Sequence, residues 1–166
     1  MTAQLDIRKV LELAIKAEDL GARFYDGLAG RFEDDDELKG LFTVLARDEE
    51  AHQFQFQRLL KELPADQRIE LPDGDQQYLE ALAAEHILDP GGDVEVTASA
   101  VRNRDDGLQR AAELERSALL YYTAIRETLG SSEVLDAIIA TEKAHLVRVM
   151  KYMVSGAEMR GLLEDY

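Results

Sequence analysis

The chain has 166 residues, no cysteine and a formal net charge of −15. A chain of this length is expected to form one domain over residues 1–166, with a single hydrophobic core. The acidic excess argues against a nucleic-acid partner, because phosphate contacts need clustered lysine and arginine. The lack of cysteine excludes disulfides, thiolate zinc sites and iron–sulfur clusters within this sequence.

No apolar segment approaches the roughly 18 residues that a membrane-spanning helix needs, and we expect no membrane partner. The first residues, MTAQLDIRKVLEL, lack the basic start, apolar run and cleavage site of a signal peptide. The negative charge also disfavours contact with an anionic membrane surface. From these observations we expect a cytoplasmic protein.

Hydrophobic residues recur at spacings of three, four and seven, which predicts helices and no convincing strand. The first helix is expected over about 5–29, with Gly30 as its C-terminal cap. The second is expected over about 35–61 and stops at Pro64. Its N-cap is expected at one of three consecutive acidic residues: Asp34, Asp35 or Asp36.

Residues 62–96 contain all three prolines and are predicted to form a long crossover connection. A short helix is expected within it, in the stretch QQYLEALAAEHIL. The third long helix is predicted over about 97–129, ending at Gly130. The fourth is predicted over about 132–154, with Ser131 or Ser132 as its N-cap. The predicted fold is all-α: a four-helix bundle of two helix hairpins joined by the crossover.

The two halves of the chain resemble each other. A shift of 93 positions places Glu49 on Glu142 and His52 on His145. A shift of 97 positions places Glu18 of the first helix on the equivalent glutamate of the third, at position 115. This pattern predicts a duplicated hairpin whose equivalent residues lie symmetrically about a central axis.

Each half contains a Glu-x-x-His motif, within DEEAH at 48–52 and TEKAH at 141–145. Residues three apart on a helix lie on one face, so each motif directs a carboxylate and an imidazole to the same point. Both motifs also lie on the apolar stripe of their helix, where an unpaired charge is costly. A metal site compensates that cost.

Glu18 and Glu115 supply the other half of the expected site. Each lies among small and aromatic residues on the inward side of its helix. Four carboxylates and two imidazoles are therefore expected to converge at the middle of the bundle. Such ligands suit iron or manganese, and zinc can occupy the same positions.

These motifs resemble those of the ferritin-like superfamily and, within it, the rubrerythrin-like di-iron proteins. The resemblance covers the four helices. It implies two iron ions, with Glu49 and Glu142 at or near bridging positions. The implied metal ligands are Glu18, Glu49, His52, Glu115, Glu142 and His145. Rubrerythrins usually carry a rubredoxin domain with a Cys₄ iron centre, which this sequence lacks, so an external electron donor is expected.

The resemblance implies an oxidoreductase that reacts with O₂ or H₂O₂ as a peroxidase or a ferroxidase, in a homodimer or small homo-oligomer. This sequence has Ala118 where rubrerythrins place a further glutamate, which helps one iron shift on oxidation. Two other functions stay open: an iron storage or delivery protein, and a structural bundle with a vestigial metal site.

Tyr25 follows Glu18 by seven residues, and Tyr122 follows Glu115 by seven. For these tyrosines, and for Tyr121, the sequence leaves two roles open. They pack in the core, or a hydroxyl near the metals hydrogen-bonds a ligand carboxylate or passes a radical. His86, the third histidine, has no glutamate three residues earlier and is expected at the surface.

Overall fold

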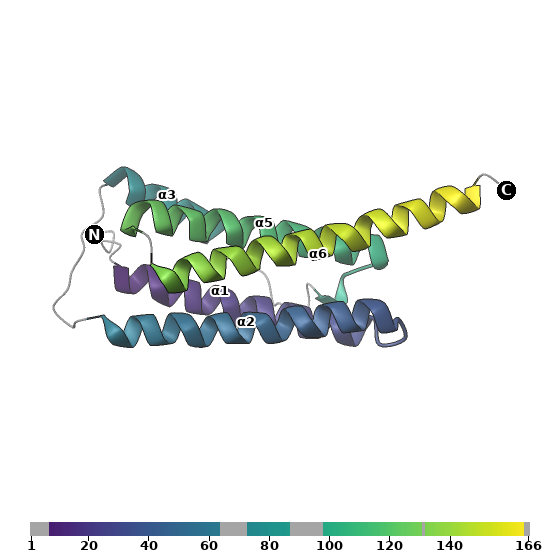
Figure 1. Cartoon of the computed structure of the whole chain (residues 1–166), viewed down its shortest axis with the longest axis horizontal. Coiled ribbons are helices and arrows are strands. Elements are labelled where there is room, and N and C mark those ends of the chain that lie inside the picture. The colour runs from purple at the N-terminus through teal and green to yellow at the C-terminus, as the bar shows by residue number, and fades with distance from the viewer. Residues whose placement is uncertain (1–6, 64–72, 87–97, 131, 165–166) are drawn as a thin grey trace.

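The computed structural model describes residues 7–63, 73–86, 98–130 and 132–164. Within these ranges no residue forms a strand. Four long helices lie side by side: α1 (Ile7–Arg31), α2 (Asp36–Glu62), α5 (Arg104–Leu129) and α6 (Glu133–Glu164) (Figure 1). The prediction of an all-α bundle with four long helices is therefore confirmed.

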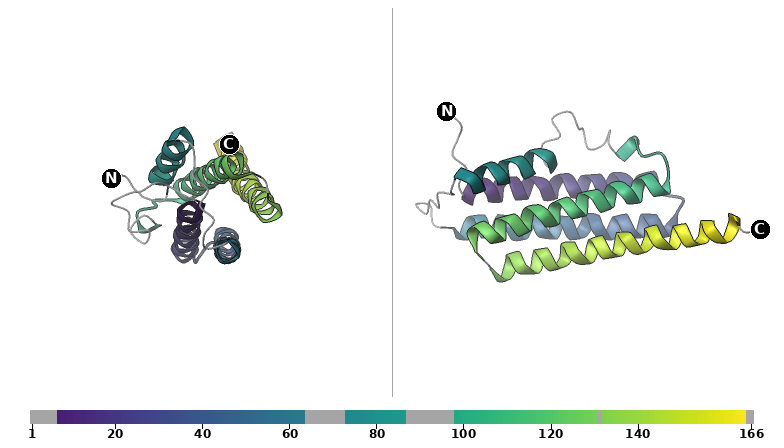
Figure 2. Two further views of the ribbon diagram at one scale, coloured as in Figure 1. Left: turned by 90° about the vertical axis from the view of Figure 1, so that its left-hand side faces the viewer. Right: turned by 90° about the horizontal axis from the view of Figure 1, so that it is seen from above.

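The bundle consists of two antiparallel hairpins, α1 with α2 and α5 with α6 (Figures 1 and 2). The predicted short helix of the crossover is α3 (Asp73–His86), which packs against α5 and α1. Its Leu79 and Leu82 are buried in one core cluster with Val10 and Tyr121. The other parts of the predicted crossover, 64–72 and 87–97, lie outside the described residues.

For two helices the sequence left the N-cap open between neighbouring residues, and the structure identifies the residue. A carboxylate oxygen of Asp35 accepts a hydrogen bond from the backbone N–H of Leu38, 3.0 Å away. The hydroxyl oxygen of Ser132 accepts one from the backbone N–H of Leu135, 3.1 Å away. Each bond satisfies an N–H group that the first helical turn leaves without a partner.

Gly30 does not cap α1, contrary to the prediction. The helix continues to Arg31, and Gly130 is the described glycine with a positive φ, 88°. Gly130 does end α5, as predicted, and its N–H donates to the carbonyl of Arg126. A glycine at a helix end therefore marks a cap only where the chain turns sharply, as it does before α6.

The third long helix begins at Arg104, later than the predicted residue 97. Asn103 is its N-cap and accepts a hydrogen bond from the N–H of Asp106. Upstream of the cap, Ala98 and Val101 are buried in the core. A β-carbon added at Gly27 of α1 would lie only 2.6 Å from that of Ala98, so the glycine permits this close approach.

The fourth helix continues to Glu164, beyond the predicted end at residue 154. Its last turns project past the ends of the other long helices (Figures 1 and 2). Gly156 does not end the helix, because an isolated glycine costs a helix only about 1 kcal/mol. The residues after it are mostly good helix formers.

The apolar core is divided into two clusters along the bundle. One contains Val10, Phe56 and Ile138, and the other contains Leu28, Phe42 and Val149. On each long helix the buried charged residues occupy the positions between these two clusters. The core therefore contains a polar layer at mid-height, which all four long helices supply. No described helix combines the length and apolar composition that crossing a membrane requires.

Candidate metal centre

The six predicted ligands form the polar layer. Each side chain points inward from its helix, and none exposes more than 5% of its surface: Glu18, Glu49, His52, Glu115, Glu142 and His145. Isolated buried charges cost several kcal/mol each unless they are paired or bind a cation. The structure thus brings together every residue that the sequence placed in the site.

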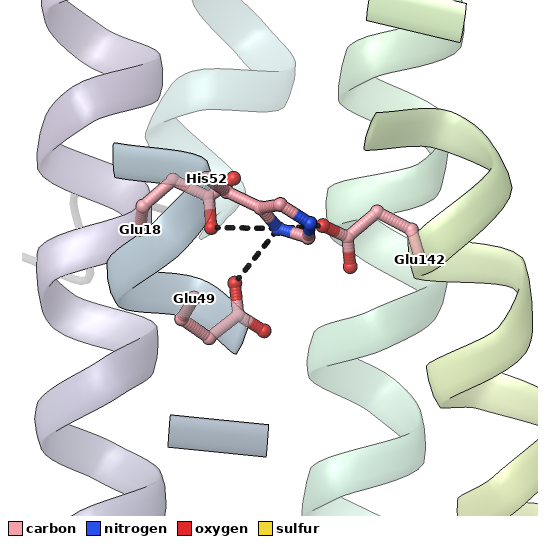
Figure 3. A group of neighbouring side chains, drawn as sticks. All are labelled: Glu18, Glu49, His52 and Glu142. Carbon is pink, nitrogen blue, oxygen red and sulfur yellow. Dashed lines mark ion pairs between the residues drawn. The ribbon is translucent and has the colours of Figure 1, made fainter. Parts of the chain in front are cut away.

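One group of four residues surrounds Nδ1 of His52 (Figure 3). This nitrogen lies 2.8 Å from Oε1 of Glu142, 3.5 Å from Oε2 of Glu18 and 3.7 Å from Oε2 of Glu49. The carboxylates come from α6, α1 and α2, while the imidazole comes from α2. Three helices therefore direct oxygen and nitrogen atoms to one point.

A second group surrounds Nδ1 of His145. This nitrogen lies 3.5 Å from Oε2 of Glu142, 3.6 Å from Oε2 of Glu115 and 3.8 Å from Oε1 of Glu49. In each group the four ligand atoms lie within 4.8 Å of one another. Glu49 and Glu142 belong to both groups and use a different oxygen toward each histidine. Each of these two carboxylates therefore faces both histidines, with one oxygen toward each.

Six buried polar atoms in this layer make no hydrogen bond: Glu18 Oε2, His52 Nδ1, Glu115 Oε2, both carboxylate oxygens of Glu142, and His145 Nδ1. Nδ1 of His52 approaches Glu142 closely, but without hydrogen-bond geometry. Buried polar atoms are normally satisfied, so a group of them facing one another points to a missing partner. Because carboxylate oxygens and imidazole nitrogens all donate electron pairs, the partner that fits is a cation.

Burial and mutual repulsion shift the ionisation of these carboxylates. Burial raises the pKa of Glu115 to about 8, and burial and the charge of Glu49 raise the pKa of Glu18. Burial also disfavours the charged form of Glu142, but the two histidines hold its pKa at about 2. Without a cation, therefore, the layer retains protons on some of its carboxylates at neutral pH.

For the two histidines, burial and the neighbouring carboxylates shift the pKa in opposite directions. Burial alone lowers the pKa of His52, but the carboxylates of Glu142, Glu18 and Glu49 raise it to about 12. His145 behaves likewise, and Glu115 and Glu142 raise its pKa to about 10. In the metal-free chain these imidazoles are therefore protonated and take the place of cations among the carboxylates.

Tyr25 and Tyr122 each hydrogen-bond to a carboxylate on a helix of the other hairpin. Tyr25 of α1 donates a hydrogen bond to Oε1 of Glu115 on α5, and Tyr122 of α5 donates one to Oε1 of Glu18 on α1. Both rings are buried within the core clusters. Each tyrosine thus fills the core and also bonds to a carboxylate, while the passage of a radical stays a prediction. Tyr121 is also buried, and its hydroxyl donates to the carbonyl of Val10, 3.4 Å away.

Asp48 belongs to the site but was missed in the sequence. Its Oδ2 lies 3.3 Å from Nε2 of His145, the ring nitrogen that faces away from the carboxylates. The available signal was its position directly before Glu49 and four residues before His52. That spacing alone does not show that its side chain reaches a histidine of another helix.

Gly21 of α1 lies against Glu49, and a β-carbon added there would be 3.5 Å from the Cγ and Cδ atoms of that glutamate. Ala118, one turn after Glu115, is half-buried and packs against the core cluster that contains Tyr122. The side chain of His86 lies outside the described residues, so its predicted surface position stays a prediction.

The fold and the site agree with two comparisons. Residues 9–88, which include α2, α3 and nearly all of α1, match the sequence model of the Rubrerythrin family. A crystal structure of a protein from Thermotoga maritima, described as a ferritin-like diiron-carboxylate protein, superposes with a TM-score of 0.70. It is 19% identical to this chain, and the match covers 94% of this chain and 99% of the other. No match was found among curated proteins.

The architecture of two hairpins around a buried carboxylate–histidine layer defines the ferritin-like fold. The chain has this fold, and its first half resembles the Rubrerythrin family.

Proposed function

We propose that the protein is a di-iron carboxylate oxidoreductase that reduces O₂ or H₂O₂, as a peroxidase or a ferroxidase. The observation that carries the proposal is the pair of four-residue groups sharing Glu49 and Glu142, with six buried atoms that lack hydrogen bonds. A solved structure with a similar fold is described as a ferritin-like diiron-carboxylate protein, which supports the proposal of iron.

The donor set fits two divalent cations. Four carboxylates balance two double positive charges, so the loaded layer is neutral and can stay buried between the apolar clusters. In the proposed centre Glu18 and His52 hold one ion, Glu115 and His145 hold the other, and Glu49 and Glu142 hold both. Manganese and zinc suit the same ligands, and the reaction requires a redox-active ion.

When bound, two ferrous ions supply the two electrons that convert H₂O₂ and two protons into two water molecules. The chain's own residues prepare the centre for those ions. The imidazoles release their protons so that both Nδ1 lone pairs face inward, and the carboxyl groups of Glu18 and Glu115 release theirs. Tyr25 and Tyr122 keep one oxygen of each terminal carboxylate fixed and leave the other oxygen free.

This sequence holds no cysteine for an iron–sulfur relay, so the electrons that such a centre would need for repeated turnover would come from another molecule. We therefore propose an external electron donor. Iron storage or delivery is the alternative, and storage requires a closed shell of many subunits. Sedimentation distinguishes the two, because the oxidoreductase proposal predicts a homodimer or small homo-oligomer.

The test is to load metal-free protein with Fe(II) anaerobically and mix it with O₂ and H₂O₂ in parallel under stopped flow. The proposal predicts oxidation of both irons, with about one H₂O₂ consumed per chain. Iron that stays ferrous with both oxidants would reject the oxidoreductase and favour a vestigial site. A Glu49→Gln variant, which alters one shared ligand, is expected to slow both reactions.

A further inference from the structure

The two histidines of the metal centre are supported unequally. His145 has contacts at both ring nitrogens, with Nδ1 toward the carboxylates and Nε2 at 3.3 Å from Oδ2 of Asp48. Among the described residues, every ion pair of His52 instead uses Nδ1. Within the described part of the chain, the histidine of one half thus has an outer carboxylate partner and the histidine of the other half has none.

The internal repeat shows where the missing partner should be. The shift of 93 positions that places His52 on His145 also places Asp48 on Thr141. The hydroxyl of Thr141 donates to the carbonyl of Ala137 in its own helix, 3.1 Å away, and it brings no carboxylate. The two halves therefore match at all six inner residues, but they differ at the position that contacts the outer side of the histidine.

A carboxylate on the outer nitrogen changes how well a histidine binds a metal ion. It accepts the Nε2–H bond, which leaves Nδ1 as the nitrogen that binds the metal ion, and it fixes the plane of the ring and makes that nitrogen more basic. Asp48 is suitably placed for this role, because its Oδ1 accepts a bond from Arg47 while its Oδ2 faces His145. Its side chain is 27% exposed, compared with 2% for His145, so it connects the buried ring to the surface.

We propose that Asp48 is a positioning residue that makes the His145 side of the centre bind its metal ion more tightly than the His52 side, so that the two ions bind in a fixed order. This inference rests on the proposed two-metal centre. The six inner residues are the same on the two sides, so they alone do not explain a difference in metal affinity.

The test is an anaerobic titration of the metal-free full chain with Co(II), followed by calorimetry and visible absorption. The wild-type chain is expected to bind two ions in two resolved steps. Asp48→Ala should weaken the tighter step about 10- to 100-fold, the usual cost of losing an outer partner of a metal-binding histidine, and leave the other step unchanged. Asp48→Asn, which keeps the side-chain shape, should weaken the same step by less.

Thr141 provides the matched control. Thr141→Ala should change neither step, because the hydroxyl bonds only to its own helix. Thr141→Asp places a carboxylate at the equivalent position of the other half and should strengthen the weaker step. Circular dichroism of each metal-free variant checks that the helices are intact.

A spectroscopic measurement separates positioning from a general effect on stability. In the Co(II)-loaded chain the ring N–H proton of each bound histidine gives a strongly shifted NMR signal. Asp48→Ala should make one of these protons exchange with D₂O faster and leave the other unchanged. A structural role alone would affect both protons.

Two resolved steps that Asp48→Ala weakens equally, or does not change, would overturn the inference while leaving the metal centre intact. Two steps of equal affinity in the wild-type chain would do the same. Binding of one Co(II) ion or none would overturn both the inference and the proposed function.

Discussion

Tyr25 of α1 donates its phenolic hydrogen to Glu115 of α5, and Tyr122 of α5 donates its own to Glu18 of α1. Each hairpin therefore holds an inner carboxylate of the other. The bonds lie on opposite sides of the polar layer, because Tyr25 and Tyr122 belong to different core clusters. They link the two hairpins and fix the orientation of the carboxylates independently of a metal ion.

Loss of either bond should destabilise the metal-free chain. Tyr25→Phe and Tyr122→Phe each leave a buried carboxyl oxygen without its donor, which costs about 1–3 kcal/mol. Tyr121→Phe is the matched control, because its hydroxyl makes only a long bond of 3.4 Å to a backbone carbonyl. Urea unfolding measures all three variants. Equal costs for the three would show that the crossed bonds contribute nothing specific.

The stability of the metal-free chain should fall as the pH rises from about 5 to about 8. In the unfolded chain a glutamate releases its proton near pH 4.3, whereas burial raises the pKa of folded Glu115 to about 8. The raised pKa values of His52 and His145 act in the same direction, since the folded chain keeps those protons above the unfolded value near 6.5. In this window the folded state binds more protons than the unfolded state, so raising the pH favours unfolding.

Bound metal ions replace these protons, so the melting temperature of the loaded chain should exceed that of the metal-free chain by more at about pH 8 than at about pH 5.5. Thermal scans of both forms at the two pH values measure the gap. In Glu115→Gln one of the proton-linked groups is absent, and the pH dependence of the metal-free form should be weaker. If the metal-free chain became more stable between these two pH values, the raised pKa values assigned to the buried groups would be wrong.

The sequence was sufficient to predict the helices, the two hairpins and the six inner residues. Spacing alone places Glu49 and His52 on one helical face, and the repeat in the second half shows that the same face is used again. Both features are local or periodic, so they do not depend on how the helices pack.

The features that the sequence did not predict depend on contacts between helices. The bond from the ring of His145 to the carboxylate of Asp48 joins α6 to α2, and the crossed tyrosine bonds join α1 to α5. The close approach of Ala98 to Gly27, upstream of α5, also joins segments that are far apart in the sequence. No periodicity within one helix contains this information.

The helical glycines of α1 and α2 should respond to alanine according to the space around them. Gly21→Ala should stabilise the metal-free chain by about 0.5–1 kcal/mol, because the new methyl meets Glu49 at an ordinary contact distance of 3.5 Å. Gly40→Ala, at an exposed position with nothing within 4 Å, is the control and should give a similar gain. Gly27→Ala should destabilise, since its β-carbon would lie 2.6 Å from that of Ala98. A gain at Gly27 in urea unfolding would contradict the packing described for residue 98.

Ala118→Glu should restore the carboxylate that rubrerythrins carry one turn after the glutamate ligand of the third long helix. Glutamate propagates helices nearly as well as alanine, so the helix should persist. An additional anion favours the ferric pair, and we expect faster oxidation of the di-ferrous form by H₂O₂ than in the wild-type chain, with a smaller change for O₂. The metal-free variant should melt lower, because five acidic groups then share the layer. Stopped-flow rates unchanged with both oxidants would place residue 118 away from the metal ions.

The most direct test of the metal centre is the number of ferrous ions that the metal-free chain binds without oxygen. An anaerobic Fe(II) titration should end at two ions per chain. Glu142→Ala, which removes a carboxylate shared by both groups, should weaken both binding steps, whereas Glu113→Ala on the exposed side of α5 should weaken neither. Binding of one ion or none, or two ions whose affinity is unchanged by the loss of Glu142, would contradict the account.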